Sequence, residues 1–206
     1  MITPSATQLA RTVRVLRQGR VLAYPTEGVW GLGCDPSNQA AVRRLLDLKG
    51  RSASKGLILI AASVDQVRHL LRDLNPQQLQ PILATWPGPV TWLVPAPPGF
   101  SSWITGGKPT LAVRVSAHTG VVALCTAFGG PIVSTSANPS GRAAALTELA
   151  VRRYFRERLD GLLPGELGGQ RGPSEIRDAL TGRIIRAASP AMMPPATPPE
   201  RRPARD

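Results

Sequence analysis

The segment of residues 24–60 constrains the possible folds more than any other part of the chain. An apolar run at residues 21–24 predicts a strand that breaks at Pro25, and a second apolar run at 57–60 predicts another strand. Between them, turn and cap residues at 35–37 begin an amphipathic helix. Its apolar side consists of Ala41, Leu45, Leu46 and Leu48. We interpret the stretch before this helix, which contains Gly28, Gly31 and Gly33, as a loop.

A cationic cluster follows this helix. Lys49, Arg51 and Lys55 fall within seven residues and are separated only by glycine, serine and alanine. Such a cluster suits a polyanion, because arginine offers a planar fork to phosphate oxygens and lysine a mobile point charge. The alternative is that these residues cap the helix, where each cation contributes only about 0.3–1 kcal/mol. The cluster alone fits both interpretations.

The remaining pattern predicts a single α/β domain with a twisted mixed β-sheet flanked by helices, because helices and strands alternate without a strict βαβ rhythm. Helices are predicted at 5–18, 64–71, 76–84, 118–128 and 147–159, and strands at 90–94, 111–115, 131–134, 162–163, 174–177 and 182–186. Residues 95–108 are predicted to form a long surface loop, and 165–172 a glycine-rich loop. We place the domain at residues 1–188 and a proline-rich, disordered tail at 189–206.

Composition limits the kinds of partner that the protein is expected to bind. The formal net charge of +12, almost wholly from arginine, favours an anionic partner such as a nucleotide or RNA. No apolar run approaches the roughly 18–20 residues that cross a bilayer, and there is no signal-peptide pattern, so we expect a cytoplasmic protein without a membrane partner. Cys34 and Cys125 lack a CxxC or histidine neighbour and are interpreted as reduced, semi-buried side chains rather than metal ligands.

Polar groups recur where predicted strands end. Thr26 follows the first strand, and residues 134–138 follow another. Ligands collect outside strand ends in open α/β sheets, so we expect these groups and the cationic cluster to share one cleft. Each has a structural alternative, because Thr26 could satisfy a turn and residues 134–138 could cap a helix. Arg114 lies within a strand, where it needs an anionic partner if buried, or else it faces outward from an edge strand.

Several common motifs are missing from the sequence. There is no GxxxxGK[ST] loop and no GxGxxG run, so a nucleotide would be held mainly by side chains. There is no HExxH either, and His69 and His118 give little support for a histidine-activated nucleophile.

Seven segments in order resemble the YrdC/Sua5 family. They are YPTEGVWGLGCDP from Tyr24, KGR from Lys49, KGLILIAAS from Lys55, WPGPVT from Trp86, LAVRV from Leu111, STSANPSG from Ser134 and PSEIRD from Pro173. The resemblance spans about residues 13–186 and includes the family's KxR and SxN pairs, here Lys49 with Arg51 and Ser136 with Asn138. One departure is Glu175, where many relatives have threonine.

The resemblance implies a YrdC-like twisted open sheet and a nucleotidyltransferase activity. ATP, bicarbonate and L-threonine would give threonylcarbamoyl-adenylate and pyrophosphate. A separate transferase complex would then use this intermediate to modify N6 of adenosine 37 in tRNA. Mg²⁺ would accompany the ATP, no dedicated protein metal site is expected, and the basic surface could contact tRNA directly.

The resemblance also assigns roles to residues. Lys49 and Arg51 would be catalytic and grip the triphosphate. ATP binding would further involve Lys55, Ser136, Asn138 and Arg186, and threonine binding would involve Thr26, Arg114, Ser134 and Ser174.

Two other interpretations remain open at this level. One is an RNA-binding module with a basic concave surface and no adenylation activity, although few aromatic residues are interleaved with the basic ones. The other is carbamoyl transfer of the kind found in hydrogenase maturation proteins, although their zinc-finger and acylphosphatase-like segments are not found here.

Overall fold

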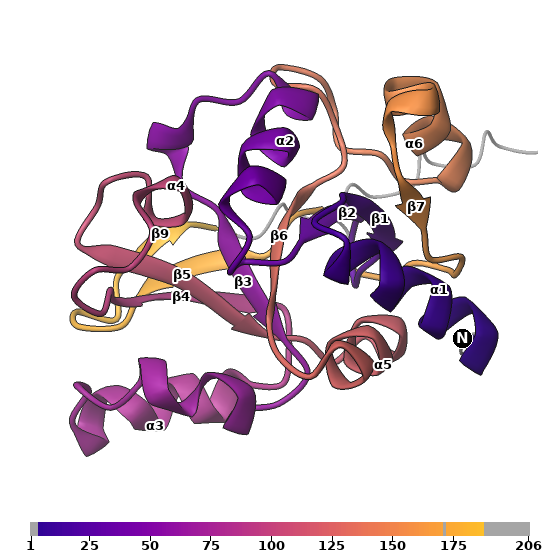
Figure 1. The fold of residues 1–206 in the computed structure, drawn as a ribbon. Coiled ribbons are helices and arrows are strands. Elements are labelled where there is room, and N and C mark those ends of the chain that lie inside the picture. Colours follow the sequence, from indigo (N-terminus) through magenta and orange to yellow (C-terminus); the bar gives the residue numbers. More distant parts are fainter. Residues whose placement is uncertain (1–3, 171, 188–206) are drawn as a thin grey trace, which may run out of the picture.

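A twisted mixed sheet runs through residues 4–170 and 172–187, the part of the chain that the computed structural model describes (Figure 1). Within that part the sheet has nine strands in the order β7-β1-β2-β6-β3-β5-β4-β8-β9. Their bounds are β1 Leu22–Pro25, β2 Trp30–Cys34, β3 Ile58–Ala61, β4 Val90–Pro95, β5 Thr110–Val115, β6 Ile132–Ser136, β7 Gly161–Leu162, β8 Glu175–Asp178 and β9 Ile184–Arg186. The β1–β7, β3–β5 and β4–β8 pairs are parallel and the other pairs antiparallel, which confirms the predicted mixed α/β sheet.

Six α-helices and three short 3₁₀ helices accompany the described strands. The α-helices are α1 Ala6–Arg17, α2 Gln39–Lys49, α3 Pro76–Thr85, α4 Ser102–Thr105, α5 Thr119–Phe128 and α6 Glu148–Phe155. The 3₁₀ helices are η1 Ala53–Lys55, η2 Asp65–Leu70 and η3 Arg156–Arg158. In this described part of the chain, none of the helices is long and apolar enough to cross a membrane.

Local capping explains why the two N-terminal helices begin where they do. Ser5 and Gln8 form a reciprocal capping box at α1. The N-cap of α2 is Asn38 rather than one of the predicted residues 35–37, whose role is to form the preceding turn. Gly50 ends α2 in the left-handed conformation, which glycine adopts without a steric penalty.

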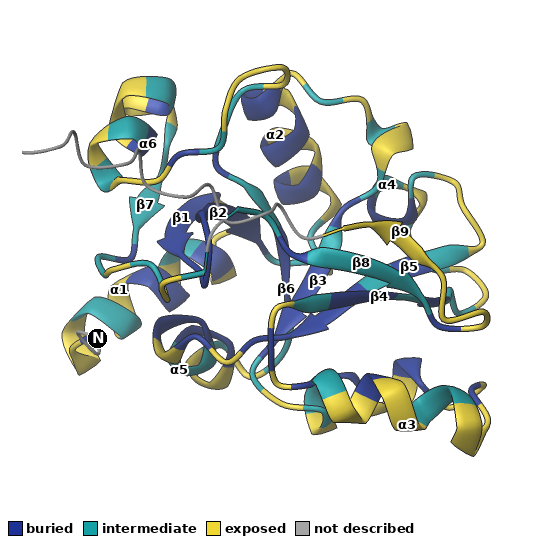
Figure 2. Cartoon of the chain, turned by 180° about the vertical axis from the view of Figure 1, so that it is seen from behind, coloured by how far each residue is buried: buried dark blue, intermediate teal, exposed yellow. Residues whose placement is uncertain are grey.

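The core is divided between the two sides of the sheet. One apolar cluster joins α1 and α5 to the sheet through Leu16, Leu124, Leu22 and Ile132. The larger cluster contains side chains from α2, α3 and α6 and the alternate strand residues, such as Val133. Figure 2 shows the central strands and the inner side of α2 as buried, whereas much of α3 is exposed. Neighbouring strand residues such as Ile132 and Val133 belong to different clusters, because successive side chains of a strand point to opposite faces of the sheet.

The loop predicted around Gly28, Gly31 and Gly33 is wrong in its second half, because residues 30–34 form strand β2. β2 lies between β1 and β6, where its glycines allow close packing. A Cβ atom at Gly33 would lie 2.7 Å from the Val133 carbonyl oxygen and 2.8 Å from the Tyr24 ring. Low strand propensity is therefore outweighed by tight contacts with both neighbours.

The predicted surface loop at 95–108 contains the short helix α4, so this prediction is also wrong in part. Ile104 and Thr105 are buried, and the Ile104 carbonyl accepts a 2.8 Å hydrogen bond from Leu57 N. Trp103 is half-buried with the Arg43 guanidinium 5.2 Å from its ring centroid. The segment predicted as a helix at 64–71 is 3₁₀ rather than α. The disorder predicted for residues 189–206 falls outside the described residues.

Candidate functional site

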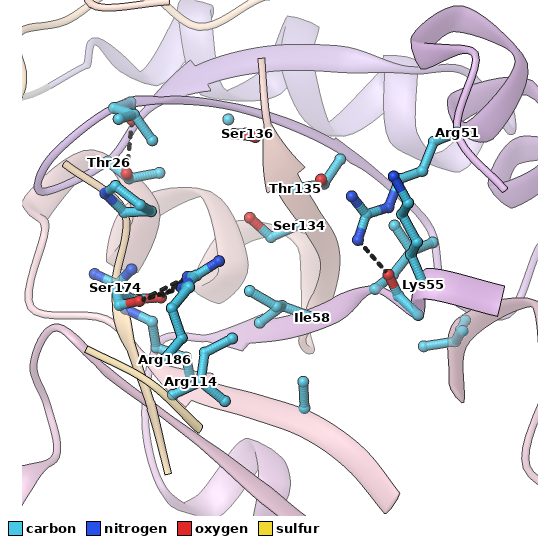
Figure 3. A pocket seen from close by; sticks show the side chains of 18 of the residues that line it. Thr26, Arg51, Lys55, Ile58, Arg114, Ser134, Thr135, Ser136, Ser174 and Arg186 are labelled. Atoms are coloured by element: carbon cyan, nitrogen blue, oxygen red, sulfur yellow. Dashed lines mark hydrogen bonds between the residues drawn. The ribbon is translucent and has the colours of Figure 1, made fainter. Parts of the chain in front are cut away.

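An open pocket lies over three neighbouring strands near the middle of the sheet (Figure 3). Its floor includes Ser134, Ile58 and Ala112, which are register partners across β6, β3 and β5. Arg114 lies two residues beyond Ala112 and so faces the same side of the sheet. Around this floor stand the β1–β2 turn, the segment after α2, the loop after α4, and β9 with the loop before β8.

Five cationic side chains line the pocket. They are Arg51, Lys55, Lys108, Arg114 and Arg186. In Figure 3, Arg51 and Lys55 come from one side and Arg186 from the other. No aspartate or glutamate of the described residues is part of the lining. The pocket therefore favours an anion with charge spread over several atoms, as in a polyphosphate.

Arg51 is half-buried, whereas Arg186 lies on the exposed strand β9, and both guanidinium groups are directed by backbone carbonyls. Arg51 Nη2 donates to the Gly56 carbonyl at 3.0 Å, and among the described residues nothing accepts a hydrogen bond from its Nε. Arg186 donates from Nε and Nη2 to the Ser174 carbonyl at 3.2 and 2.6 Å. Burial lowers the pKa of both groups, and for Arg186 the charge of Arg51 lowers the pKa further. A bound anion would relieve both effects.

Lys49 is predicted as a triphosphate ligand, but the structure does not bring it into the pocket lining. Its ammonium is buried behind the wall, where it donates to the carbonyl of Ser136, to the Asn138 carbonyl at 2.7 Å and to Asn138 Oδ1 at 3.3 Å. The Lys49 carbonyl in turn accepts from Ser140 N at 2.7 Å. Burial, and then the Arg51 charge, lower the pKa of Lys49 to about 7. Lys49 thus ties the end of α2 to the turn after β6.

Asn138 also lies outside the pocket lining, whereas Ser136 is part of it. Asn138 Oδ1 accepts from Ser136 Oγ at 2.6 Å, and its Nδ2 donates to the Pro139 and Arg142 carbonyls at 3.1 and 2.6 Å. Lys49, Ser136 and Asn138 therefore meet in a partly buried network, and of the two predicted pairs only Arg51 and Ser136 line the pocket.

The four residues predicted to bind threonine all line the pocket: Thr26, Arg114, Ser134 and Ser174. The hydroxyl groups of the threonine and the two serines are fixed by hydrogen bonds to buried partners. Thr26 Oγ1 donates to the Val29 carbonyl at 2.7 Å, and Ser134 Oγ accepts from the Tyr24 hydroxyl at 2.7 Å. Ser174 Oγ lies 2.9 Å from Thr91 Oγ1. These side chains present oriented hydroxyls around Arg114.

The anionic partner of Arg114 is Glu27, a residue that the sequence analysis missed. The two side chains form a buried ion pair, and Arg114 Nε donates to the Gly88 carbonyl at 3.0 Å. A signal was present in the sequence, because a buried arginine needs a carboxylate and Glu27 stands beside Thr26. Glu175, noted for its departure from the family pattern, pairs instead with Arg177.

Lys108 is a pocket residue that the sequence analysis also missed. It falls in the segment predicted as a surface loop, where no pattern indicated contact with the pocket. Thr135 lines the pocket too, as expected for the 134–138 segment, although the sequence analysis assigned it no role of its own.

Comparison with known proteins identifies relatives of this arrangement. The Sua5/YciO/YrdC family model, described as "Telomere recombination", matches residues 14–188. A threonylcarbamoyl-AMP synthase of Pseudomonas paraeruginosa is 55% identical over 175 residues, which cover 85% of this chain and 94% of the relative. One of Halorhodospira halophila is 56% identical over 171 residues, covering 83% and 90%.

A solved structure gives the same fold. The crystal structure of Sua5 from P. abyssi complexed with L-threonine aligns with a TM-score of 0.78 at 30% identity. The alignment covers 82% of this chain and 50% of the Sua5 chain, so the chain spans about half the length of that protein.

Proposed function

The chain belongs to the Sua5/YciO/YrdC family, and on that premise we propose that it is a nucleotidyltransferase that makes threonylcarbamoyl-AMP and pyrophosphate from ATP, L-threonine and bicarbonate. The observation that carries this proposal is one pocket in which five cations and several fixed hydroxyls surround a space without a lining carboxylate from the described residues. Such a space accepts a triphosphate and an amino-acid carboxylate together.

The chemistry uses positioning and charge rather than a protein nucleophile. Bicarbonate takes up a proton and loses water to give carbon dioxide, and the threonine amine adds to this carbon dioxide and loses a proton, which gives a carbamate. A carbamate oxygen then attacks the α-phosphorus, and the bond to the β-phosphate oxygen breaks as pyrophosphate leaves. Negative charge moves onto the leaving group, so fixed cations lower the barrier.

We assign the triphosphate to the side of the pocket with Arg51 and Lys55, with Arg186 opposite and Ser136 nearby. The threonine carboxylate is assigned to Arg114, with Thr26, Ser134 and Ser174 meeting its polar groups. Lys49 and Asn138 do not line the pocket and are assigned the role of holding Ser136 and the turn that follows it.

Mg²⁺ is proposed to enter as part of the nucleotide substrate. Among the described residues no group of three or more histidine, cysteine, aspartate or glutamate side chains could hold a metal. Mg²⁺ commonly binds through substrate phosphates with few protein ligands, which suits a pocket of this composition.

The product belongs to tRNA modification. We propose that a separate transferase complex receives the adenylate and transfers its threonylcarbamoyl group to N6 of adenosine 37. We also propose that tRNA contacts the basic surface of the protein directly, and the net charge of +12 supports this part of the proposal.

The test is pyrophosphate release by purified protein. We expect release from ATP only when both threonine and bicarbonate are present, and less with serine in place of threonine. Tight, steeply salt-dependent RNA binding without threonine-dependent pyrophosphate release would overturn the proposal and favour an RNA-binding module.

A further inference from the structure

We infer that Glu27 is a positioning residue for amino-acid binding, which acts by fixing the guanidinium of Arg114 at the pocket floor. The inference rests on the proposed function, because it treats Arg114 as the partner of the threonine carboxylate. Glu27 does not line the pocket, so any effect on the amino acid passes through Arg114.

Two contacts fix the direction of the Arg114 guanidinium. Its Nε donates to the Gly88 carbonyl at 3.0 Å, and its Nη2 pairs with Glu27 Oε2. The side chains are only 8% and 10% exposed, so neither contact is open to exchange with bulk water. Arg114 still lines the pocket, and the rest of its planar fork can meet a carboxylate in one orientation.

Glu27 is itself held rigidly. Its Oε1 accepts from Ser116 Oγ at 2.8 Å and from Ala117 N at 3.1 Å, which leaves Oε2 for Arg114. Burial raises the pKa of Glu27, but the Arg114 charge and the Ser116 hydrogen bond outweigh it and hold the pKa below its usual range. The carboxylate is therefore ionised at neutral pH.

The backbone of the same turn orders another part of the pocket. The Glu27 carbonyl accepts from Gln170 N at 2.9 Å, and the Thr26 carbonyl accepts from Gly168 N at 3.1 Å. These bonds dock the loop that leads to Ser174. Glu27 thus contacts Arg114 through its side chain and the loop before β8 through its backbone.

Glu27 neutralises the charge of Arg114, and this changes how the substrate carboxylate is recognised. The ion pair has no net charge, so Arg114 offers the carboxylate a preset geometry rather than an excess of attraction. Removing the carboxylate of Glu27 frees the guanidinium to turn, and a reoriented arginine loses its alignment with the substrate.

The experiment compares Glu27→Gln with wild type, using Glu148→Gln as a matched control. Glu148 forms an exposed ion pair with Arg152 on α6 and does not line the pocket. We expect Glu27→Gln to raise the KM for threonine about tenfold or more while the KM for ATP changes less than about twofold. An unchanged or lower KM for threonine, or equal changes in both KM values, would overturn the inference.

A double-mutant cycle tests whether Glu27 acts through Arg114. In an Arg114→Gln background, adding Glu27→Gln should change the KM for threonine by less than about twofold, because the residue it positions is already gone. If Glu27→Gln alone does not fold, the double variant still provides a comparison, because it places two neutral amides where the ion pair was and leaves no buried charge unpaired. Independent, multiplying effects would contradict the inference.

Calorimetric titration with L-threonine separates this inference from the proposed function. Wild type that binds threonine but releases no threonine-dependent pyrophosphate would refute the proposed reaction. In that case, weaker threonine binding by Glu27→Gln would still support the inference, and equal binding would overturn it.

Discussion

Arg51 is half-buried in the pocket, and its charge adds to desolvation in lowering the pKa of Arg186. Within the described part of the chain, the Arg51 guanidinium makes one hydrogen bond, to the Gly56 carbonyl, which orients it toward the ligand space. Arg51 and Arg186 repel each other in the free protein, and both would interact favourably with a polyphosphate bound between them.

We therefore predict that Arg51→Ala lowers kcat/KM for threonine-dependent pyrophosphate release by at least about tenfold, a loss of about 1.4 kcal/mol at the transition state. Arg68→Ala is the control, since Arg68 forms an exposed ion pair with Asp65 on η2. Full activity of Arg51→Ala would refute the assigned role.

Lys49 gives a prediction on pH. Its native pKa is lowered to about 7 from an ordinary value of 10.5, so between these values the unfolded chain binds more protons than the native protein. Stability from this residue therefore rises with pH across that window. Lys49→Met removes the slope, so the free energy of unfolding of wild type relative to the variant should increase from about pH 7 to about pH 9. Urea denaturation at both pH values measures it, and a constant difference would contradict the burial argument.

At the scale of elements, the strongly patterned helices and strands were predictable and the exceptions have local causes. β2 was missed because Gly31 and Gly33 lack strand propensity, and only the proximity of β1 and β6 explains them. α4 was missed because four residues give no helical period, and its burial depends on the distant Leu57 segment. Both failures are cases in which tertiary contacts override local preference.

Gly28, in the β1–β2 turn, packs closely against the backbone of a distant loop. A Cβ atom there would lie 2.0 Å from the Gly172 carbonyl oxygen, so an alanine forces the loop before β8 away from the turn. We predict that Gly28→Ala costs about 1–3 kcal/mol of stability and raises the KM for threonine. Gly130→Ala is the control, since no atom lies within 4 Å of its added Cβ. Thermal unfolding and steady-state kinetics measure both effects, and identical behaviour of the two variants would contradict the close approach.

At the scale of the whole molecule, the pocket collects cations from segments that are far apart in sequence. The resemblance predicted that Arg51, Lys55, Arg114 and Arg186 share this pocket. The first three belong to quoted family motifs, and Arg186 lies at the end of the span of resemblance. The sequence could not predict Lys108, whose place depends on the path of the loop after α4, nor that Lys49 turns away to bind carbonyls.

Lys108 is exposed at the pocket, so its contribution should be modest and sensitive to salt. We predict that Lys108→Gln raises the KM for ATP by less than about tenfold at low ionic strength, with little change in the KM for threonine. Raising the salt from about 50 mM to about 300 mM should shrink the difference from wild type. Arg17→Gln, an exposed change on α1, controls for net charge. An effect on KM for ATP that does not weaken with salt would contradict a screened, exposed contact.

One wall of the pocket contains Ser174 and Arg186, which come from the loop before β8 and from β9. Both lie more than a hundred residues after Arg51 in the sequence. A nascent polypeptide on the ribosome can order β1 to β6 well before these residues emerge. Until Arg186 has emerged, a growing chain would consequently lack the cation that stands opposite Arg51, and the binding pocket would be incomplete.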